Sequence, residues 1–148
     1  MIFSGLLLKG IYVLIIKINK TIRVTVGALG LLAFPEGLYA YFGSAQNNLE
    51  LRVKRHRSVK KRLFWHIDYL LNNEATKVIV VYYTQGNKTK ECKIARLLKE
   101  NAEPIASFGC SDYHCKSHLF HAENFLILEK RMQPLTMQNI NPEREFTP

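Results

Sequence analysis

Basic side chains at helical spacing point to chemistry on phosphate groups. Arg52 and His56 lie four residues apart within the segment RVKRHRSVKKR, residues 52–62. If this segment is helical, the two side chains share one face. A guanidinium can donate to two phosphate oxygens at once, and an imidazole one turn later can bind an adjacent phosphate or move a proton. The other interpretation is a solvated helix face without a ligand.

The charge of the whole chain favours phosphate binding. Of the 148 residues, 47% are hydrophobic, which is typical of a globular domain. The formal net charge of +9 indicates a polyanionic partner. The polyanion is either a nucleic acid or an anionic membrane face, and a nucleic acid would contact the cations of the basic segment and two further histidines. These expected nucleic-acid-binding residues are Lys54, Arg55, Arg57, Lys60, Lys61, Arg62, His66 and His118.

The elements that must position these residues are recognisable from hydrophobic periodicity. Strands are expected over residues 10–18, 21–26, 38–42 and 77–84, with one or two more within 118–128. Helices are expected from an Asn47 or Asn48 cap to about Arg57, then over 60–71 and 89–100. The third helix should turn Cys92, Ile94, Ala95 and Leu98 inward, and Pro104 should close it.

This order of elements predicts an α+β fold, with a small, mostly antiparallel sheet covered by about three helices. We expect one domain over residues 1–130 and a loose C-terminal tail over 131–148. Lys9 and Gly10 interrupt the apolar start of the chain, so neither a signal peptide nor a membrane span is expected. The odd number of cysteines, three, argues against a disulfide framework, and we expect a cytoplasmic protein without a membrane partner.

Two clusters remain open to more than one interpretation. In FWHIDYL, we expect Trp65 either to pack in the core or at its rim, or to stack on an unpaired base. We expect His66 to lie near His56 and Asp68 to pair with a basic neighbour. The second cluster could hold structural zinc, but its spacing is unlike the usual zinc-finger patterns. The alternative is a loop that packs on the active face and touches the substrate. The cluster consists of Cys110, His114, Cys115 and His118.

Three motifs in this order resemble the GIY-YIG nuclease superfamily. They are Gly10-Ile11-Tyr12 on a strand, Tyr41-Phe42-Gly43 on a later strand, and Arg52 with His56 on the following helix. Longer segments, among them FPEGLYAYFGSA and FGCSDYHCKSHLF, resemble a mainly archaeal branch of small proteins. Members of that branch also occur fused to endonuclease III-type repair enzymes.

The resemblance implies a metal-dependent endonuclease. Glu91, just after the strand KVIVVYYT, takes the place of the glutamate that binds Mg²⁺ or Mn²⁺ in the superfamily. Arg52 would brace the scissile phosphate, and Tyr12 or Tyr41 would help to take a proton from water, with His56 beside them. For both tyrosines the alternative is a half-buried core residue whose hydroxyl is satisfied.

Two functions of different class follow. The first is an endonuclease that hydrolyses DNA, with a role in DNA repair. The second is a non-catalytic nucleic-acid-binding module that partners an endonuclease III-type repair enzyme. A basic protein that docks on another protein or on a membrane is a weaker third hypothesis. The expected strands also leave long sheet edges that a second copy of the chain could cover as a homodimer.

Overall fold

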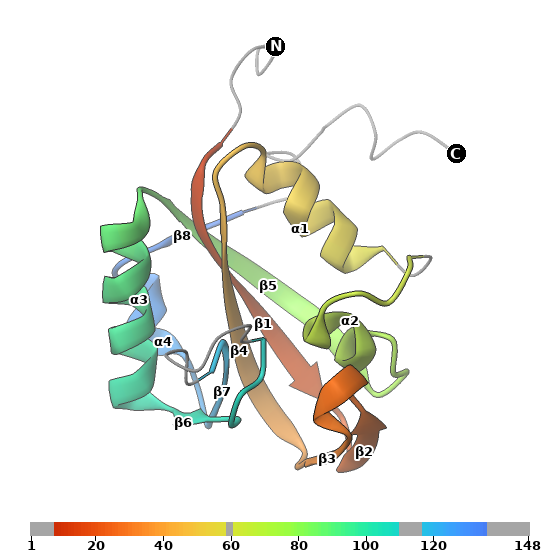
Figure 1. The fold of residues 1–148 in the computed structure, drawn as a ribbon. Coiled ribbons are helices and arrows are strands. Elements are labelled where there is room, and N and C mark those ends of the chain that lie inside the picture. The colour runs from red at the N-terminus through yellow and green to blue at the C-terminus, as the bar shows by residue number, and fades with distance from the viewer. Residues whose placement is uncertain (1–7, 59–60, 110–116, 136–148) are drawn as a thin grey trace.

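A six-stranded antiparallel sheet forms the centre of the computed structural model, which describes residues 8–58, 61–109 and 117–135 (Figure 1). The strand order is β6-β7-β4-β1-β5-β8. The α+β prediction with a mostly antiparallel sheet is confirmed. The strands are β1 (Gly10–Ile18), β4 (Gly37–Ala45), β5 (Thr76–Gln85), β6 (Glu103–Pro104), β7 (Leu119–Ala122) and β8 (Gln133–Pro134).

Strand β1 lies between its two longest partners and sets the register of the sheet. It pairs along its whole length with β4 on one side and β5 on the other. Lys17 is its one exposed residue. Burial on both faces explains why GIYVLIIKI is a nearly continuous apolar run, without the polar alternation of a half-exposed strand.

Helices cover both faces of the sheet (Figure 1). Helices α1 (Leu49–Arg57) and α2 (His66–Leu71) pack on the face that carries Tyr12, Leu14 and Ile16. Helices α3 (Lys88–Asn101) and α4 (Leu126–Glu129) pack on the face of Ile11, Val13 and Ile15. Successive residues of β1 therefore contribute to two separate cores.

Capping residues determine where the two long helices begin. The Asn48 side chain accepts a hydrogen bond from the Leu51 amide at 3.0 Å, and Asn87 accepts one from the Thr89 amide at 3.0 Å. Helix α1 has the bounds expected from the sequence. In α3 the inward side is formed by Ile94 and Leu98, whereas Cys92 is exposed, so the prediction that Cys92 faces inward is wrong.

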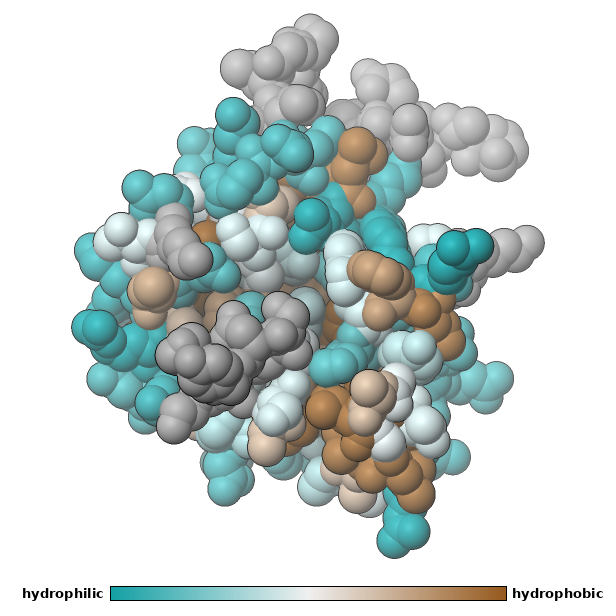
Figure 2. Space-filling view, viewed as in Figure 1, coloured by the Kyte–Doolittle hydropathy of each residue, from teal (hydrophilic) through white to brown (hydrophobic). Residues whose placement is uncertain are grey.

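A small hairpin projects beyond one end of the sheet. It consists of β2 (Ile22–Thr25), the short 3-10 helix η1 (Gly27–Leu29) and β3 (Leu31–Phe34), which pairs antiparallel with β2. Apolar side chains gather on this part of the surface (Figure 2), where Leu31 is 62% exposed. Strand β3 was not expected, because a single buried residue, Phe34, gives LLAF no clear alternation.

Two other expectations need correction. The helix expected over 60–71 begins only at His66, because the Asp68 carboxylate accepts the backbone amides of Phe64 and Trp65 and holds the chain extended there. The described fold continues past residue 130. Strand β8 pairs with β5, and Met132 and Leu135 are buried. Residues 136–148 of the expected tail lie outside the described ranges.

Candidate active site

A buried hydrogen bond joins the first strand to the first helix. The Tyr12 hydroxyl lies 2.8 Å from Nε2 of His56, and both side chains are 2% exposed. Tyr12 comes from β1 and His56 from the last turn of α1. The fold thus brings together two residues that the sequence predicted as site residues.

Glycines of the two strand motifs make room for this arrangement. Gly43 lies directly opposite Tyr12 in the β1–β4 register, and a Cβ at position 43 would be 2.5 Å from the Tyr12 hydroxyl oxygen. Gly10 has φ +153°, and a Cβ there would collide with the Thr84 carbonyl. The glycines therefore allow the tyrosine ring and the neighbouring backbone to approach closely.

Tyr41 lies on the same sheet face beside this pair. Its ring meets that of His56 edge-on at a centroid distance of 5.9 Å, and the residue is 8% exposed. Burial raises the pKa of Tyr12 to about 12, although the positive charge of Arg52 opposes the shift, and burial also raises the pKa of Tyr41. Both phenols are therefore protonated at neutral pH.

His56 is held as a neutral imidazole. Burial lowers its pKa to about 3, and the negative charge of Asp68 only partly offsets this effect. Its Nδ1 is buried and has no hydrogen-bond partner among the described residues. A neutral ring has one donor and one acceptor nitrogen, so Nε2 can accept from Tyr12 if Nδ1 carries the proton.

Arg52 occupies the helix turn before His56. Its Nη1 donates to the Ser44 carbonyl across 3.4 Å, and its Cζ lies 4.9 Å from the centroid of the Trp65 ring. The hydrogen bond is long, so an anion could replace the carbonyl as its acceptor. Arg52 is thus placed at the rim of the Tyr12–His56 pair with donors to offer.

A second arginine holds the loop beside the site. Arg55 donates to both carboxylate oxygens of Asp68, at 2.9 and 3.0 Å, and to the Arg62 carbonyl at 3.1 Å. Lys61 donates to the carbonyls of His56 and Arg55 at the end of α1. These two expected phosphate ligands therefore bind acceptors within the protein.

The other expected nucleic-acid-binding residues fall into two groups. Lys54 is half-buried on α1, whereas Arg57 and Arg62 are exposed. The two histidines contact the protein backbone. His66 Nδ1 accepts the Gly109 amide at 2.8 Å, and the His118 Nδ1 lies 3.0 Å from the Phe42 carbonyl. No hydrogen bond or ring contact joins His66 to His56 within the described ranges.

Two expected features fall in segments that the structure leaves undescribed. Lys60 is one of them. The other is most of the cysteine-histidine cluster, of which only His118 lies within the described ranges; Cys110, His114 and Cys115 do not. His118 stacks on Phe42 with a centroid distance of 4.4 Å and lies 6.3 Å from the Tyr41 ring.

Glu91 is separated from the tyrosines by the sheet. It is half-buried in the first turn of α3, the helix that packs on the opposite face. Helix α3 starts just beyond Gln85, which pairs with Gly10, so Glu91 and Tyr12 belong to the same end of the sheet. Among described residues, the Glu91 side chain has no hydrogen bond or ion pair, and no group of three metal-ligating side chains forms.

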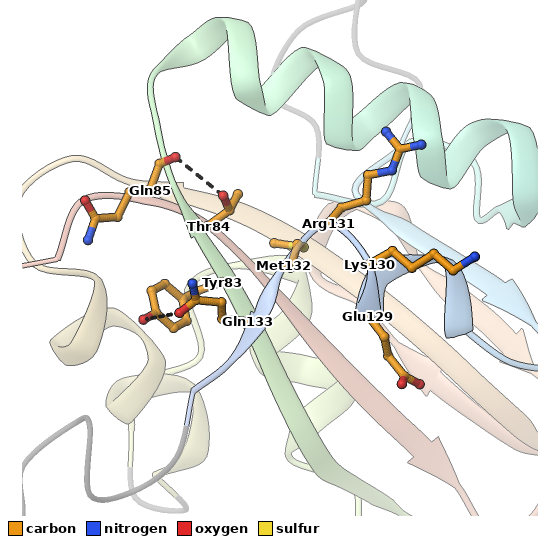
Figure 3. Close-up of a pocket in the computed structure, with 8 residues that line it drawn as sticks. All are labelled: Tyr83, Thr84, Gln85, Glu129, Lys130, Arg131, Met132 and Gln133. Carbon is orange, nitrogen blue, oxygen red and sulfur yellow. Dashed lines mark hydrogen bonds between the residues drawn. The ribbon is translucent and has the colours of Figure 1, made fainter.

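A pocket of about 520 Å³ opens where β5 and β8 pair (Figure 3). Tyr83, the cross-strand neighbour of Tyr12, donates from its hydroxyl to the Gln133 side chain at 3.1 Å. Lys130 and Arg131 supply positive charge on the other side of β8. Tyr83 was not among the predicted site residues, although its place in the alternation of KVIVVYYT could have put it on the Tyr12 face.

Comparison with known proteins identifies a family. Residues 11–139 match the family described as "Domain of unknown function DUF123". The chain belongs to the DUF123 family. No curated protein and no solved structure matches the chain.

The matched residues 11–139 include Tyr12, the motif Tyr41-Phe42-Gly43 and the whole of α1 and α3. The match also runs past residue 130, which agrees with the pairing of β8 in the sheet. No helix in the described part of the domain is long and apolar enough to cross a membrane.

Proposed function

We propose that this DUF123 domain is a divalent-metal-dependent endonuclease of the GIY-YIG type that hydrolyses DNA, with a role in DNA repair. The observation that carries the proposal is the buried Tyr12–His56 hydrogen bond beside Arg52. It combines a hydrogen-bonded pair that can orient water with a phosphate ligand, in a strongly basic protein. The order of elements that the resemblance implies, a first strand, a later strand and then a basic helix, corresponds to β1, β4 and α1 and supports the same function.

Each of these residues has a defined part in phosphodiester hydrolysis. Arg52 exchanges its long bond to the Ser44 carbonyl for the scissile phosphate and balances the charge that develops on its oxygens. The Tyr12 hydroxyl donates to Nε2 of His56, so its oxygen is free to accept a hydrogen bond from the attacking water and to orient that water toward the phosphorus, while the proton of the water leaves to solvent. Tyr41 packs against the His56 ring and excludes water from it.

Glu91 is the residue that would hold the metal. Its carboxylate is a hard oxygen donor, half-exposed and without an ion-pair partner in the described chain, which fits Mg²⁺ or Mn²⁺ bound by one carboxylate, waters and substrate oxygens. When bound, the ion would polarise the phosphate and stabilise the leaving oxygen. All other steps are assigned to the side chains around Tyr12.

The proposal is tested by cleavage of labelled DNA structures in the presence of Mn²⁺. The panel contains branched, flapped, abasic and single-stranded substrates, each also used in a gel-shift assay. The parent protein should cut at least one substrate, and Glu91→Gln should bind it without cutting. Glu100→Gln, an exposed carboxylate on the same helix, is the matched control and should cut like the parent. Equal cutting by Glu91→Gln and the parent would disprove the metal role of Glu91.

A non-catalytic module for a repair enzyme is the second candidate. It is favoured by the burial of Tyr12 and Tyr41, whose raised pKa values suit stable core phenols. In the same panel, this function requires that parent and Glu91→Gln bind equally and that neither cuts.

A further inference from the structure

We propose that Phe64 stacks on an unpaired base of a single-stranded nucleic acid bound beside α1. The inference rests on the proposed function and specifies its substrate class. Phe64 is 71% exposed, which exceeds the exposure of every other large hydrophobic side chain in the described ranges. An aromatic ring presented to solvent is the group on which bases stack, and stacking tolerates any base sequence.

The ring is presented by a rigid backbone. The amides of Phe64 and Trp65 both donate to Oδ2 of Asp68, at 2.9 and 2.8 Å. Asp68 is fully buried and is held in turn by two hydrogen bonds from Arg55. The backbone at residues 64 and 65 therefore needs little further ordering when a ligand binds, which favours a preformed site over an incidental exposed residue.

Phe64 also continues an aromatic series that leads to the candidate active site. Its ring centroid is 6.0 Å from that of Trp65, and the Trp65 ring is 5.6 Å from the ring of His56. His56 in turn binds Tyr12. A base on Phe64 would thus belong to a nucleotide close to the phosphate that Arg52 contacts.

Positive charge around these rings selects a nucleic acid as the occupant. The guanidinium carbons of Arg52 and Arg55 lie 4.9 and 4.4 Å from the Trp65 ring centroid, and Arg62 is exposed two residues before Phe64. Apolar protein interfaces are depleted of charge at their centre, whereas single-strand sites combine a basic track with aromatic rings. Since paired bases stack on each other, a fully paired duplex leaves no base for Phe64.

Binding of short oligonucleotides tests this inference without any need for cleavage. The probes are a labelled oligothymidylate of about 8 nucleotides, an oligouridylate of the same length and a matched duplex. Anisotropy of the label gives affinities for DNA and RNA strands. Fluorescence of Trp65, the single tryptophan of the chain, reports on the site itself.

Single strands should bind more tightly than the duplex and quench Trp65. Phe64→Ala should weaken single-strand binding about fivefold or more and leave duplex binding and the salt slope unchanged, because no phosphate contact is lost. Phe64→Tyr, which keeps an aromatic ring, should restore the affinity. Leu31→Ala is the matched control, since Leu31 is 62% exposed on β3, and it should bind like the parent.

Equal losses in Phe64→Ala and Leu31→Ala, or an equal loss for duplex and single strand, would overturn the stacking role. Such a result would not contradict hydrolysis at Tyr12 and Arg52, which the cleavage assay tests separately. Conversely, Phe64-dependent binding by a protein that cuts nothing would support the stacking site and contradict the nuclease. A parent that binds none of the three probes would overturn the inference and leave Phe64 as a contact for a protein or membrane.

Discussion

The activity that we propose for this DUF123 domain depends on the contact between a buried tyrosine and a buried histidine. Tyr12 and His56 are each 2% exposed, and their mutual hydrogen bond satisfies the phenol and one ring nitrogen. Burial favours the neutral form of both groups. A charged His56 would be left without a carboxylate in contact, because the nearby Asp68 is paired with Arg55.

The low pKa of His56 predicts how stability changes with pH. The pKa is about 3 in the folded protein and about 6.5 in an unfolded chain, so between these values the unfolded chain binds a proton that the folded protein does not. The free energy of unfolding contributed by His56 should therefore fall as the pH drops below about 6.5, by up to about 1.4 kcal/mol per pH unit. Urea unfolding at pH values between neutral and about pH 5 measures this fall in the free energy of unfolding.

NMR titration of the five histidines provides the direct check. The His56 ring should stay neutral at about pH 5, where an ordinary histidine is charged. A His56 midpoint near the ordinary value of about 6.5 would contradict the buried, neutral imidazole that accepts the hydrogen bond from Tyr12.

At the scale of elements, the backbone at residues 64 and 65, just before α2, is held by one carboxylate. Asp68 binds Arg55 from α1 and the amides of Phe64 and Trp65, and the Trp65 ring then packs beside Arg52 and His56. The position of the basic helix relative to the aromatic loop thus depends on Asp68.

Asp68→Asn should destabilise the protein strongly. The substitution keeps the size of the side chain but removes the charge that pairs with Arg55, and it turns one acceptor oxygen into a donor. We expect the free energy of unfolding to fall by about 3 kcal/mol in urea titrations, as for a broken buried pair. Glu74→Gln removes an exposed charge just after α2 and should change the free energy of unfolding by less than about 0.5 kcal/mol. A similar loss in both variants would show that Asp68 has no special role.

Local sequence signals predicted the elements whose causes are local. The apolar run of β1 and the Asn48 cap of α1 are such signals, and both elements lie where expected. The helix expected from residue 60 was wrong. The apolar stripe predicts a helix there, but Asp68 keeps residues 64 and 65 out of helical conformation and is itself bound to Arg55 from another helix. This cause lies in tertiary structure and leaves no periodic signal in the sequence.

At the scale of the whole molecule, the sheet separates the candidate site residues. The sequence placed Tyr12, Tyr41, Arg52 and His56 in one site by resemblance, and the fold puts all four on one side of the sheet. Glu91 lies in the first turn of α3, which packs on the other face of the sheet. The order of elements along the chain could not predict this, because it does not specify which face α3 covers. Within the described ranges, the expected long sheet edges are covered only in part, since β8 pairs with Tyr82 and Tyr83 alone of the ten residues of β5.

The net charge of +9 predicts binding to nucleic acid that weakens steeply with salt. About six phosphate contacts would lower the affinity about a thousandfold between about 50 mM and about 200 mM salt, because each contact releases counterions. Arg62→Ala should reduce the slope of log affinity against log salt by about 0.9. Arg23→Ala, an exposed arginine on the β2–β3 hairpin, should leave the slope unchanged. Equal slopes for parent and Arg62→Ala would place the phosphate track elsewhere.

The single-turnover cleavage rate of Tyr12→Phe tests the central claim most directly. The substitution removes only the hydroxyl that bonds His56, and Tyr39→Phe is its control, because Tyr39 is buried on the same sheet face and its hydroxyl donates to the Pro35 carbonyl. We predict that Tyr12→Phe binds DNA like the parent but cuts it at least about 100-fold more slowly, while Tyr39→Phe keeps the parent rate. Equal cleavage rates for Tyr12→Phe and the parent would contradict a catalytic role for the Tyr12–His56 pair.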